Sequence, residues 1–579
     1  MTVSSAPPVA SRARSGWRLP DAPLGDWVPV ALICLVIGLL VLPPLVVIIQ
    51  TSLTERGGAL TFDHYRSVFG ALHLTGPLVF NSLAFSGGSA FLALAFGTGL
   101  AWLAERTNAP FRGAVYTAAF VSFAIPAIIK VIGWILLLGP RAGVVNVWLR
   151  DLFGLAEPPI NLFSLGGMIV LEALLWTPLV FLLMSTPFRS MDAALEDASS
   201  ASGAGNWTTF RKVTFRLALP SALAVLLLTF ARSLEAFDIP ALIGIPAGIS
   251  VFTTEIYLQT KKGFLPSYGE ASAYAVVLIA IVGLALYPYH LATRESQRFA
   301  TITGKGFRPR VIDLGRWRLL GGACMLVLPA LVLMPFLILV WASLLPYFQA
   351  PSAEALKSLT LSNYPAAFSN TNVASAVSNS LFVSLIAASG TVVLALLAAW
   401  LSARSRSKHR WLIDQLATLP LVFPGIVLGI AVLRLYLALP LPIYGTLWIL
   451  IIAYVTRFLP YGMRYCHSGI VGIHRDLEEC AAASGATWWS VMRRIIVPLM
   501  MPALFAGWIN IFLITVRELS VAILLYSPGT QLISITFWEL WQNGQVPELA
   551  AFSIVVCGGL VALSMVFHRM SERYGYRGV

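Results

Sequence analysis

Charged residues are scarce in this chain of 579 residues. Asp, Glu, Lys and Arg together account for 11% of the sequence and hydrophobic residues for 58%, whereas about 25% of an ordinary soluble domain is charged. Soluble cores cannot hide so much apolar surface, which excludes a soluble enzyme. The apolar residues instead form long runs, and about 20 residues are enough to cross a bilayer as a helix.

Cysteine and histidine are few as well. The 5 cysteines show neither a disulfide framework nor the spacing of metal ligands, and none of the 7 histidines pairs with another at i,i+4 within a predicted span. We therefore expect no metal site, no cofactor bound by this chain and no catalytic residues.

A nucleotide-binding loop is also missing. The segment Thr303–Gly306 resembles part of a P-loop, but that motif requires Gly at the position of Phe299 and Ser or Thr at the position of Gly306. The net charge of +13 does not indicate a nucleic-acid partner, because in a membrane protein the placement of the cations tells more than their sum. The chain must therefore act without a nucleotide site of its own.

The apolar runs predict an all-α polytopic membrane protein with about 12 transmembrane helices, whose lipid partner is the bilayer. If the N-terminus is cytoplasmic, most of the 39 Lys and Arg residues fall on the cytoplasmic side, as the positive-inside rule requires. Residues 1–26 then form a cytoplasmic disordered tail, and the C-terminus is cytoplasmic too. The predicted spans are 28–51, 79–103, 114–138, 164–185, 217–233, 273–291, 319–344, 377–402, 412–436, 445–461, 498–516 and 550–568.

The chain contains an internal repeat. We interpret it as two homologous halves of six spans each, at 27–292 and 319–579, joined by a polar cytoplasmic linker at 293–318. Six spans is an even number, so both halves have the same orientation, which argues against inverted-topology repeats. The matches are Asn81–Leu83 with Asn379–Leu381, Ala101–Leu103 with Ala399–Leu401, Arg106 with Arg404, and Pro126 with Pro424.

The strongest repeat lies between the fourth and fifth spans of each half. Leu195–Pro220 and Leu477–Pro502 align without a gap. Each stretch predicts a short acidic helix of small residues, a turn at Gly203 or Gly485, and a basic helix that re-enters the membrane. The identical pairs include Leu195 with Leu477, Glu196 with Glu478, Ser202 with Ser484, Gly203 with Gly485, Ala204 with Ala486, Trp207 with Trp489, Arg211 with Arg493 and Pro220 with Pro502.

This hairpin of two helices suits docking better than catalysis. Small Ala and Ser side chains leave a helix surface flat enough for a partner to approach closely. Glu196 and Glu478 lie near helix starts, where the macrodipole favours a carboxylate that can meet an arginine of a partner. The alternative, an ordinary amphipathic inner loop, does not account for the same pattern occurring twice.

These two stretches resemble the EAA coupling loop of binding-protein-dependent ABC importer permeases, with Asp197-Ala198 and Glu479-Cys480 as departures from its Ala-Ala. The resemblance implies an ABC ATPase homodimer that carries ATP and Mg and docks from the cytoplasm, a periplasmic solute-binding protein, and a bacterial inner membrane. The implied coupling residues are Glu196, Asp197, Ala198, Gly203, Ala204, Glu478, Glu479, Gly485 and Ala486.

Two such domains in one chain, with the linker and the stretch Glu235–Pro240, resemble the fused ferric-iron-type permeases in particular. The implied function is movement of ferric iron from periplasm to cytoplasm, and thiamine, phosphonates, polyamines and oxyanions are alternative cargoes. A secondary transporter or channel of two parallel halves is an alternative from another class, against which the duplicated hairpin argues. A scaffold that only recruits an ATPase would not need kinked spans with charges inside them.

Charged residues that follow the fifth and eleventh spans are candidates for a translocation path. A charge inside a span costs roughly 2.5 to 3.5 kcal/mol on insertion scales, so it tends to face a cavity or a partner. Arg232, Glu235, Arg517 and Glu518 occupy nearly equivalent places, and carboxylates suit a hard cation such as ferric iron. A local Arg–Glu pair that closes a helix end is the alternative. At the matched prolines of the third and ninth spans we expect packing kinks rather than gate hinges.

Overall fold

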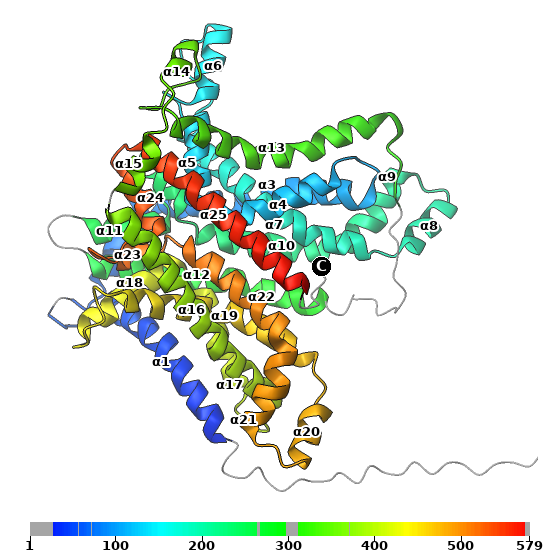
Figure 1. Ribbon diagram of the computed structural model, residues 1–579, viewed down its shortest axis with the longest axis vertical. Helices are drawn as coiled ribbons and strands as arrows, with labels where there is room; N and C mark the ends of the chain where they lie inside the picture. The colour runs from blue at the N-terminus through cyan, green and yellow to red at the C-terminus, as the bar shows by residue number, and fades with distance from the viewer. Residues whose placement is uncertain are drawn as a thin grey trace, which may run out of the picture.

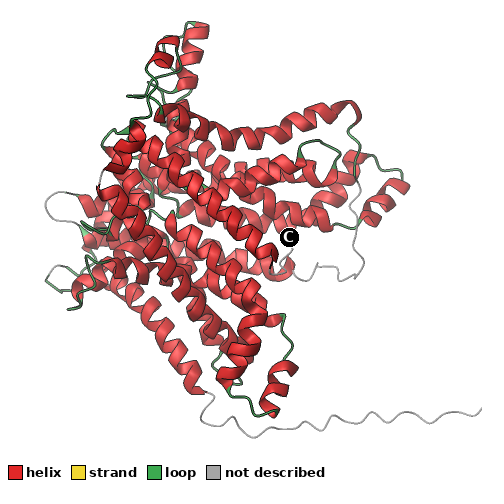
Figure 2. Ribbon diagram, in the orientation of Figure 1, coloured by secondary structure: helices red, strands yellow, loops and turns green. Residues whose placement is uncertain are grey.

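The computed structural model describes residues 27–573 apart from residues 56, 71, 263–266, 297–310 and 370. Figure 2 shows that helices make up the regular structure of this part of the chain, and two isolated β-bridges are the only strand-like pairings within it. The predicted tail at 1–26 and most of the predicted linker lie outside the described residues. The all-α fold class is confirmed.

The helices of the first half carry the chain through twelve numbered α segments. They are α1 (Trp27–Ser52), α2 (Asp63–Gly70), α3 (Leu72–Arg106), α4 (Arg112–Ala124), α5 (Ala127–Leu138), α6 (Val144–Phe153), α7 (Leu165–Ser190), α8 (Ala193–Ala201), α9 (Asn206–Thr209), the π-helix η2 (Phe210–Thr214), α10 (Phe215–Leu234), the π-helix η3 (Pro240–Gly244), α11 (Phe252–Lys261) and α12 (Tyr268–Ser296).

The second half repeats this order after a short 3-10 turn, η5 (Gly315–Trp317). Its helices are α13 (Arg318–Ser343), α14 (Ala353–Lys357), α15 (Asn363–Ser369), α16 (Thr371–Arg404), α17 (Trp411–Thr418), η6 (Leu419–Val422), α18 (Gly425–Ala438), α19 (Leu447–Val471), α20 (Asp476–Ala483), α21 (Trp488–Val491), the π-helix η7 (Met492–Ile496), α22 (Val497–Val516), α23 (Ala522–Leu525), α24 (Ile533–Gln542) and α25 (Val546–Arg573).

Nine helices in the described residues are long and apolar enough to cross a membrane. The predicted third and ninth spans are each broken into two helices, α4 with α5 and α17 with α18, so the number rises to eleven if each bent pair counts as one span. The predicted span 445–461 falls on α19, a continuous helix that holds Arg457 and Arg464. It is not among the candidate spans, although it packs along α16 in the core of the second half.

Proline causes both breaks. Pro126 and Pro424 lack the N–H that a helix needs and push the preceding residue out of the helical region. Ile125 and Phe423 accordingly have extended ψ angles of 125° and 109°. The kinks expected at these two positions are full breaks, because the chain bends by 110° in the first half and 106° in the second. The prolines inside α7 and α19 leave those helices continuous.

A lysine caps the break in the first half. In a continuous helix the carbonyl oxygen of Ser122 accepts a hydrogen bond from the residue four positions later, and that residue is Pro126, which has no N–H. The Nζ atom of Lys130 donates instead, at 3.1 Å to this carbonyl oxygen and at 3.3 Å to the Ser122 hydroxyl. The repeat places Leu428 at the equivalent position of the second half, so this cap belongs to the first half alone.

The two halves exchange their first helices. α1 packs against α17 and α18 of the second half as well as α12 of its own, and α13 packs against α4 and α5 of the first half as well as α25 of its own. The most extensive helix packing within each half is between α3 and α7 in the first half and between α16 and α19 in the second. Figure 1 shows α13 lying along the edge of the first half and α1 along the edge of the second.

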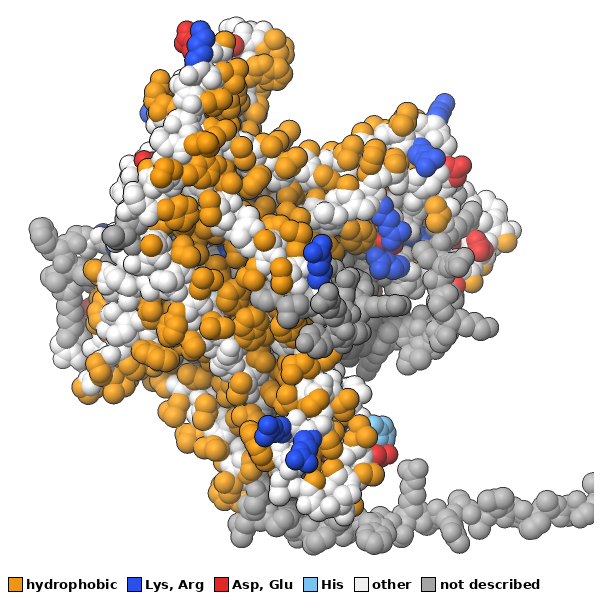
Figure 3. Space-filling view, in the orientation of Figure 1, with side chains coloured by type: hydrophobic (Ala, Val, Ile, Leu, Met, Phe, Trp, Pro, Cys, Tyr) orange, Lys and Arg blue, Asp and Glu red, His pale blue; other side chains and the backbone are white. Residues whose placement is uncertain are grey.

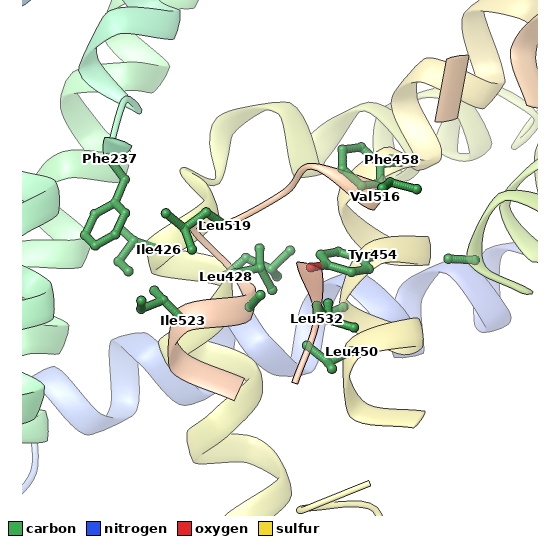
Figure 4. Close-up of a cluster of buried hydrophobic side chains, with 14 of the residues drawn as sticks. Phe237, Ile426, Leu428, Leu450, Tyr454, Phe458, Val516, Leu519, Ile523 and Leu532 are labelled. Carbon is green, nitrogen blue, oxygen red and sulfur yellow. The ribbon is translucent and has the colours of Figure 1, made fainter. Parts of the chain in front are cut away.

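One side of the molecule is closed between the halves and the other is splayed. In Figure 4 the ring of Phe237 from the first half points toward Ile426 and Leu519 of the second, and all three side chains are buried. At the other side α8 and α20 lie far apart (Figure 1). Figure 3 shows charged side chains gathered near these two ends, with a largely apolar surface between them and the closed side.

Candidate functional site: two hairpins and a central charged layer

Both predicted hairpins are present. α8 is followed by a turn and then by α9, η2 and α10, while α20 is followed by a turn and then by α21, η7 and α22. Gly203 and Gly485 have φ angles of 81° and 80°, a left-handed conformation that favours glycine. The N–H of Ala204 returns to the carbonyl of Ser199 at 3.1 Å, which closes the end of α8.

An arginine holds each hairpin to the helix bundle. A nitrogen of Arg106, at the end of α3, donates a short hydrogen bond to Glu196, and the hydroxyl of Thr214 donates to the same carboxylate at 2.7 Å. In the second half Arg404, at the end of α16, donates to Glu478 at 2.7 Å. The two arginines match each other in the sequence repeat, and so do the two glutamates. We call this repeated Arg–Glu ion pair the clasp.

These clasps give the glutamates a different role from the predicted one. The sequence places Glu196 and Glu478 where they can meet a partner's arginine, whereas in the structure each binds an arginine of this chain. What the hairpins expose is a set of small and apolar residues beside acidic ones, with Trp207 and Trp489 exposed at 73% and 63%. The exposed members of the predicted set are Asp197, Ala198, Gly203, Glu479 and Gly485, and Ala204 and Ala486 are half-buried.

Each hairpin rejoins the membrane through a π-helical turn. η2 and η7 occupy equivalent positions, and each carries two basic residues. π-Helical turns inside helices often occur at functional sites because they rotate the side chains that follow. The π-turns were not foreseen from the sequence, since no residue type specifies one.

The segment before α13 attaches to the first hairpin's anchor. The N–H of Ile312 donates to the carbonyl of Arg106 at 2.8 Å, and the N–H of Asn108 donates to Ile312 at 3.2 Å. The side chain of Asn108 also reaches Asp313 at 2.5 Å. The N–H of Gly315 and the Asn108 amide hold the pKa of the exposed Asp313 carboxyl below its usual value. The connection between the halves thus touches the helix end that holds Glu196.

The carboxylates among the four path candidates are in two different settings. Arg232 donates to Glu235 at 3.0 Å and closes the end of α10. Glu518 does not pair with the adjacent Arg517. It lies 3.6 Å from Arg457 of α19 and accepts the N–H of Val521 at 3.0 Å.

Arg517 lies near enough to Lys130 of the first half for the two positive charges to repel each other. The described residues contain no group of three or more His, Cys, Asp or Glu side chains that could hold a metal ion. The carboxylates of Glu235 and Glu518 are occupied by arginines, so in this state they form ion pairs rather than a ligand shell.

The family described as "Binding-protein-dependent transport system inner membrane component" matches residues 93–291 and 391–573, more than half of the chain. A Haemophilus influenzae protein named as a ferric transport system permease is 26% identical over 71% of this chain and 64% of its own length, so the match spans just under two thirds of that relative.

Two further likenesses cover less of the chain. A Salmonella typhimurium protein named for 2-aminoethylphosphonate transport is 26% identical over 29% of this chain and 63% of its own. A solved bacterial alginate ABC transporter has a chain with a TM-score of 0.39 and 21% identity that covers 48% of this chain and 96% of its own length.

Proposed function

This chain belongs to the family of binding-protein-dependent transport system inner membrane components, and we propose that it forms the transmembrane path of an ATP-driven importer in a bacterial inner membrane. The duplicated hairpin carries this proposal. Each hairpin is fixed at its base by an Arg–Glu clasp and exposes small residues beside acidic and apolar ones, which is the form of a docking element. An ABC ATPase homodimer docks on the two tips, one ATPase to each.

The hairpins lie in the cytoplasm and a periplasmic solute-binding protein delivers cargo to the opposite side. The clustering of Lys and Arg near the hairpin ends supports this orientation, as does the positive-inside rule, which also places both termini in the cytoplasm. When the ATPases close on ATP, they bring α8 and α20 together. α10 and α22 continue from the hairpins toward the central charges, so the movement passes along them as a rigid-body shift.

Ferric iron is the cargo that we propose. The similarity to the Haemophilus influenzae protein supports it, and so does the arrangement of two permease halves in one chain. Because the described residues offer no metal-ligand cluster, iron passes without resting at a fixed metal site, and selection falls to the solute-binding protein. The similarity to the Salmonella typhimurium protein favours 2-aminoethylphosphonate as a second candidate cargo.

Co-purification from native membrane in mild detergent tests the proposed assembly. We expect a P-loop ATPase at two copies per chain, and its loss in Glu478→Arg and Gly485→Pro variants that still insert in the membrane. Lys357→Ala on α14, far from both hairpins, is the matched control and should retain the ATPase. Absence of any ATPase after cross-linking would overturn the importer assignment.

Uptake into cells or proteoliposomes that contain the whole complex tests the cargo. Radiolabelled ferric iron should accumulate in an ATP-dependent manner, and 2-aminoethylphosphonate should not. If only the phosphonate accumulates, the phosphonate is the cargo instead of iron, and the importer assignment is unaffected. Uptake driven by an ion gradient without ATP would favour a secondary transporter.

A further inference from the structure

A layer of charged side chains joins the two halves beside their apolar contact. The ionic layer consists of Arg232, Glu235 and Asp238 from the first half and Arg457 and Glu518 from the second. Next to it lies an apolar seal of aromatic and aliphatic side chains that meet across the halves. In this seal the rings of Phe237 and Tyr257 of the first half each lie 6.2 Å from the ring of Trp538 of the second. Leu519 lies beside Phe237 (Figure 4).

The two ion pairs of the layer are built differently. Arg232 and Glu235 are separated by one helical turn at the end of α10, with 3.0 Å between their charged atoms. Arg457 comes from α19 and reaches Glu518, after α22, at 3.6 Å. The pairing within the layer therefore differs between the halves, although the loops that carry Glu235 and Glu518 occupy nearly equivalent places in the repeat.

Contacts across the halves link these pairs into one network. The guanidinium of Arg232 lies 5.7 Å from the ring centre of Tyr461 on α19, a cation–π contact between the halves. The charge of Arg457 also acts on Glu235 and Asp238 of the first half, at a range longer than an ion pair. Arg457 thus pairs with a carboxylate of its own half, and its charge also acts on carboxylates of the other half.

Arg457 is tightly confined. A Cβ atom at Gly425, the first residue of α18, would lie 1.7 Å from the Nη1 atom of Arg457, so the guanidinium rests against the start of that helix. This Nη1 atom makes no hydrogen bond, and the Glu518 oxygen is 3.6 Å away. A largely buried cation whose Nη1 donor is unused depends on its neighbouring carboxylates, because little water is present to replace them. The network holds only while the halves keep this arrangement.

The helices that end at the ionic layer begin at the hairpins. α10 and α22 run from η2 and η7 to the segments that carry Glu235 and Glu518. α19 (Leu447–Val471) holds Arg457 and ends shortly before α20. If α8 and α20 approach each other, all three helices must move relative to the opposite half. Such a movement changes the distances among the charges on which Arg457 depends.

We propose that the ionic layer is a latch that keeps the hairpins apart and the apolar seal closed, and that it parts when the hairpins approach. The inference rests on the proposed function. It identifies Arg457 and the first-half carboxylates as the groups that decide whether the latch is closed. In the latched state the charges satisfy one another across the interface. In the unlatched state the separated charges are exposed to the opened path, where water and cargo solvate them.

The distance between the hairpins reports the state of the latch directly. Ser202 and Ser484 occupy matching exposed positions at the two turns, so Ser202→Cys with Ser484→Cys provides two sites for spin labels after the five native cysteines are replaced. Pulsed electron–electron double resonance on the purified chain in lipid nanodiscs should give one long distance between the two labels. In an Arg457→Ala background we expect a second, shorter distance to appear without ATPase or nucleotide.

Arg464→Ala is the matched control, because Arg464 lies on the same helix with an exposed side chain and should leave the single long distance unchanged. Glu235→Gln, on the other half, should act like Arg457→Ala and serves if that variant fails to accumulate. An unchanged distance in both Arg457→Ala and Glu235→Gln would overturn the latch. Failure of the ATPase to shorten the distance in the parent chain would instead count against the proposed function.

Discussion

The two hairpins share a clasp but differ in how deeply it is buried. The side chains of Arg106 and Glu196 are exposed at 0% and 6%, whereas those of Arg404 and Glu478 are exposed at 12% and 15%. Two nitrogens of Arg106 make no hydrogen bond, while one nitrogen of Arg404 also donates to the carbonyls of neighbouring residues on and after α19. The first clasp is therefore deeper and less completely satisfied, so its two charges depend more strongly on each other.

The surroundings explain the difference. In the first half the segment at 311–314 pairs with the end of α3, and Glu105 forms a second ionic cluster there with Arg112 at 2.7 Å and Arg189 at 3.2 Å. The repeat places Ala403 at the position equivalent to Glu105, so the second half has no such cluster around that residue. Identical residues can thus make a core contact in one half and a partly solvated one in the other.

Removal of Glu196 should have the largest effect. Glu196→Ala leaves Arg106 buried without its carboxylate, and breaking a buried pair from one side costs about 3–5 kcal/mol. We expect a marked fall in the thermal unfolding temperature in detergent and protease cleavage within 191–205. Lys212→Ala, at an exposed residue of η2 in the same hairpin, should leave both measurements near those of the parent. A Glu196→Ala chain as resistant as the parent would contradict the deep clasp.

Removal of Glu478 should cost less. Arg404 keeps its hydrogen bonds to the carbonyls of Ile470 at 3.3 Å and Ile473 at 2.6 Å, and it is partly solvated. The loss should be about 1.5–3 kcal/mol, as for a hydrogen bond to a charged group. The same unfolding and proteolysis assays, read at the second hairpin, measure it. If Glu478→Ala equals or exceeds Glu196→Ala, burial does not set the difference between the hairpins.

Substitution of the turn glycines should affect both hairpins alike. A Cβ atom at Gly203 or Gly485 would meet nothing within 4 Å, so Gly→Ala carries only the cost of a left-handed backbone, roughly 1–2 kcal/mol. ATP-coupled uptake should fall by a similar factor for each variant when measured at equal membrane levels. A response at one hairpin only would show that the ATPase pair uses the two tips unequally.

The attachment of the linker should respond to pH with the smallest effect. Because the pKa of Asp313 is lowered in the folded chain, its interactions are complete above the ordinary value of about 3.9 and are lost as pH falls through the lowered value. Pepsin should therefore cut within 311–317 only well below pH 4, as followed by mass spectrometry at stepped pH. Asp313→Asn should be cut more readily across the whole pH range. An identical pH profile for both chains would show that the Asp313 carboxylate does not hold the linker in place.

Much of this architecture is foreseeable from the sequence. The low charge predicts the helical membrane fold, the gapless repeat predicts the hairpins, and the positive φ at Gly203 and Gly485 agrees with a glycine turn. The arginines that pair with the two glutamates, Arg106 and Arg404, can also be recognised in the sequence as matched positions of the repeat. Their pairing with the glutamates was not foreseen, because a repeat shows that two positions correspond without showing which other residues they touch.

The central layer was harder to foresee. Arg457 lies within a predicted span far from Glu518 in sequence, and its role depends on how α19 packs against the loops after α10 and α22. The large bends at Pro126 and Pro424 were underestimated for a similar reason. A proline marks where a helix is weakened, while the surrounding helices decide whether it bends slightly or breaks.

The exchange of first helices has a consequence for biosynthesis. α1 is made before the rest of the described chain, yet two of the helices that it contacts, α17 and α18, follow more than three hundred residues later. Until then one face of α1 has only lipid beside it. A chain truncated after the first half would contain α1 without its partners α17 and α18. Cellular quality control would then have to distinguish this unpartnered helix from a misfolded one.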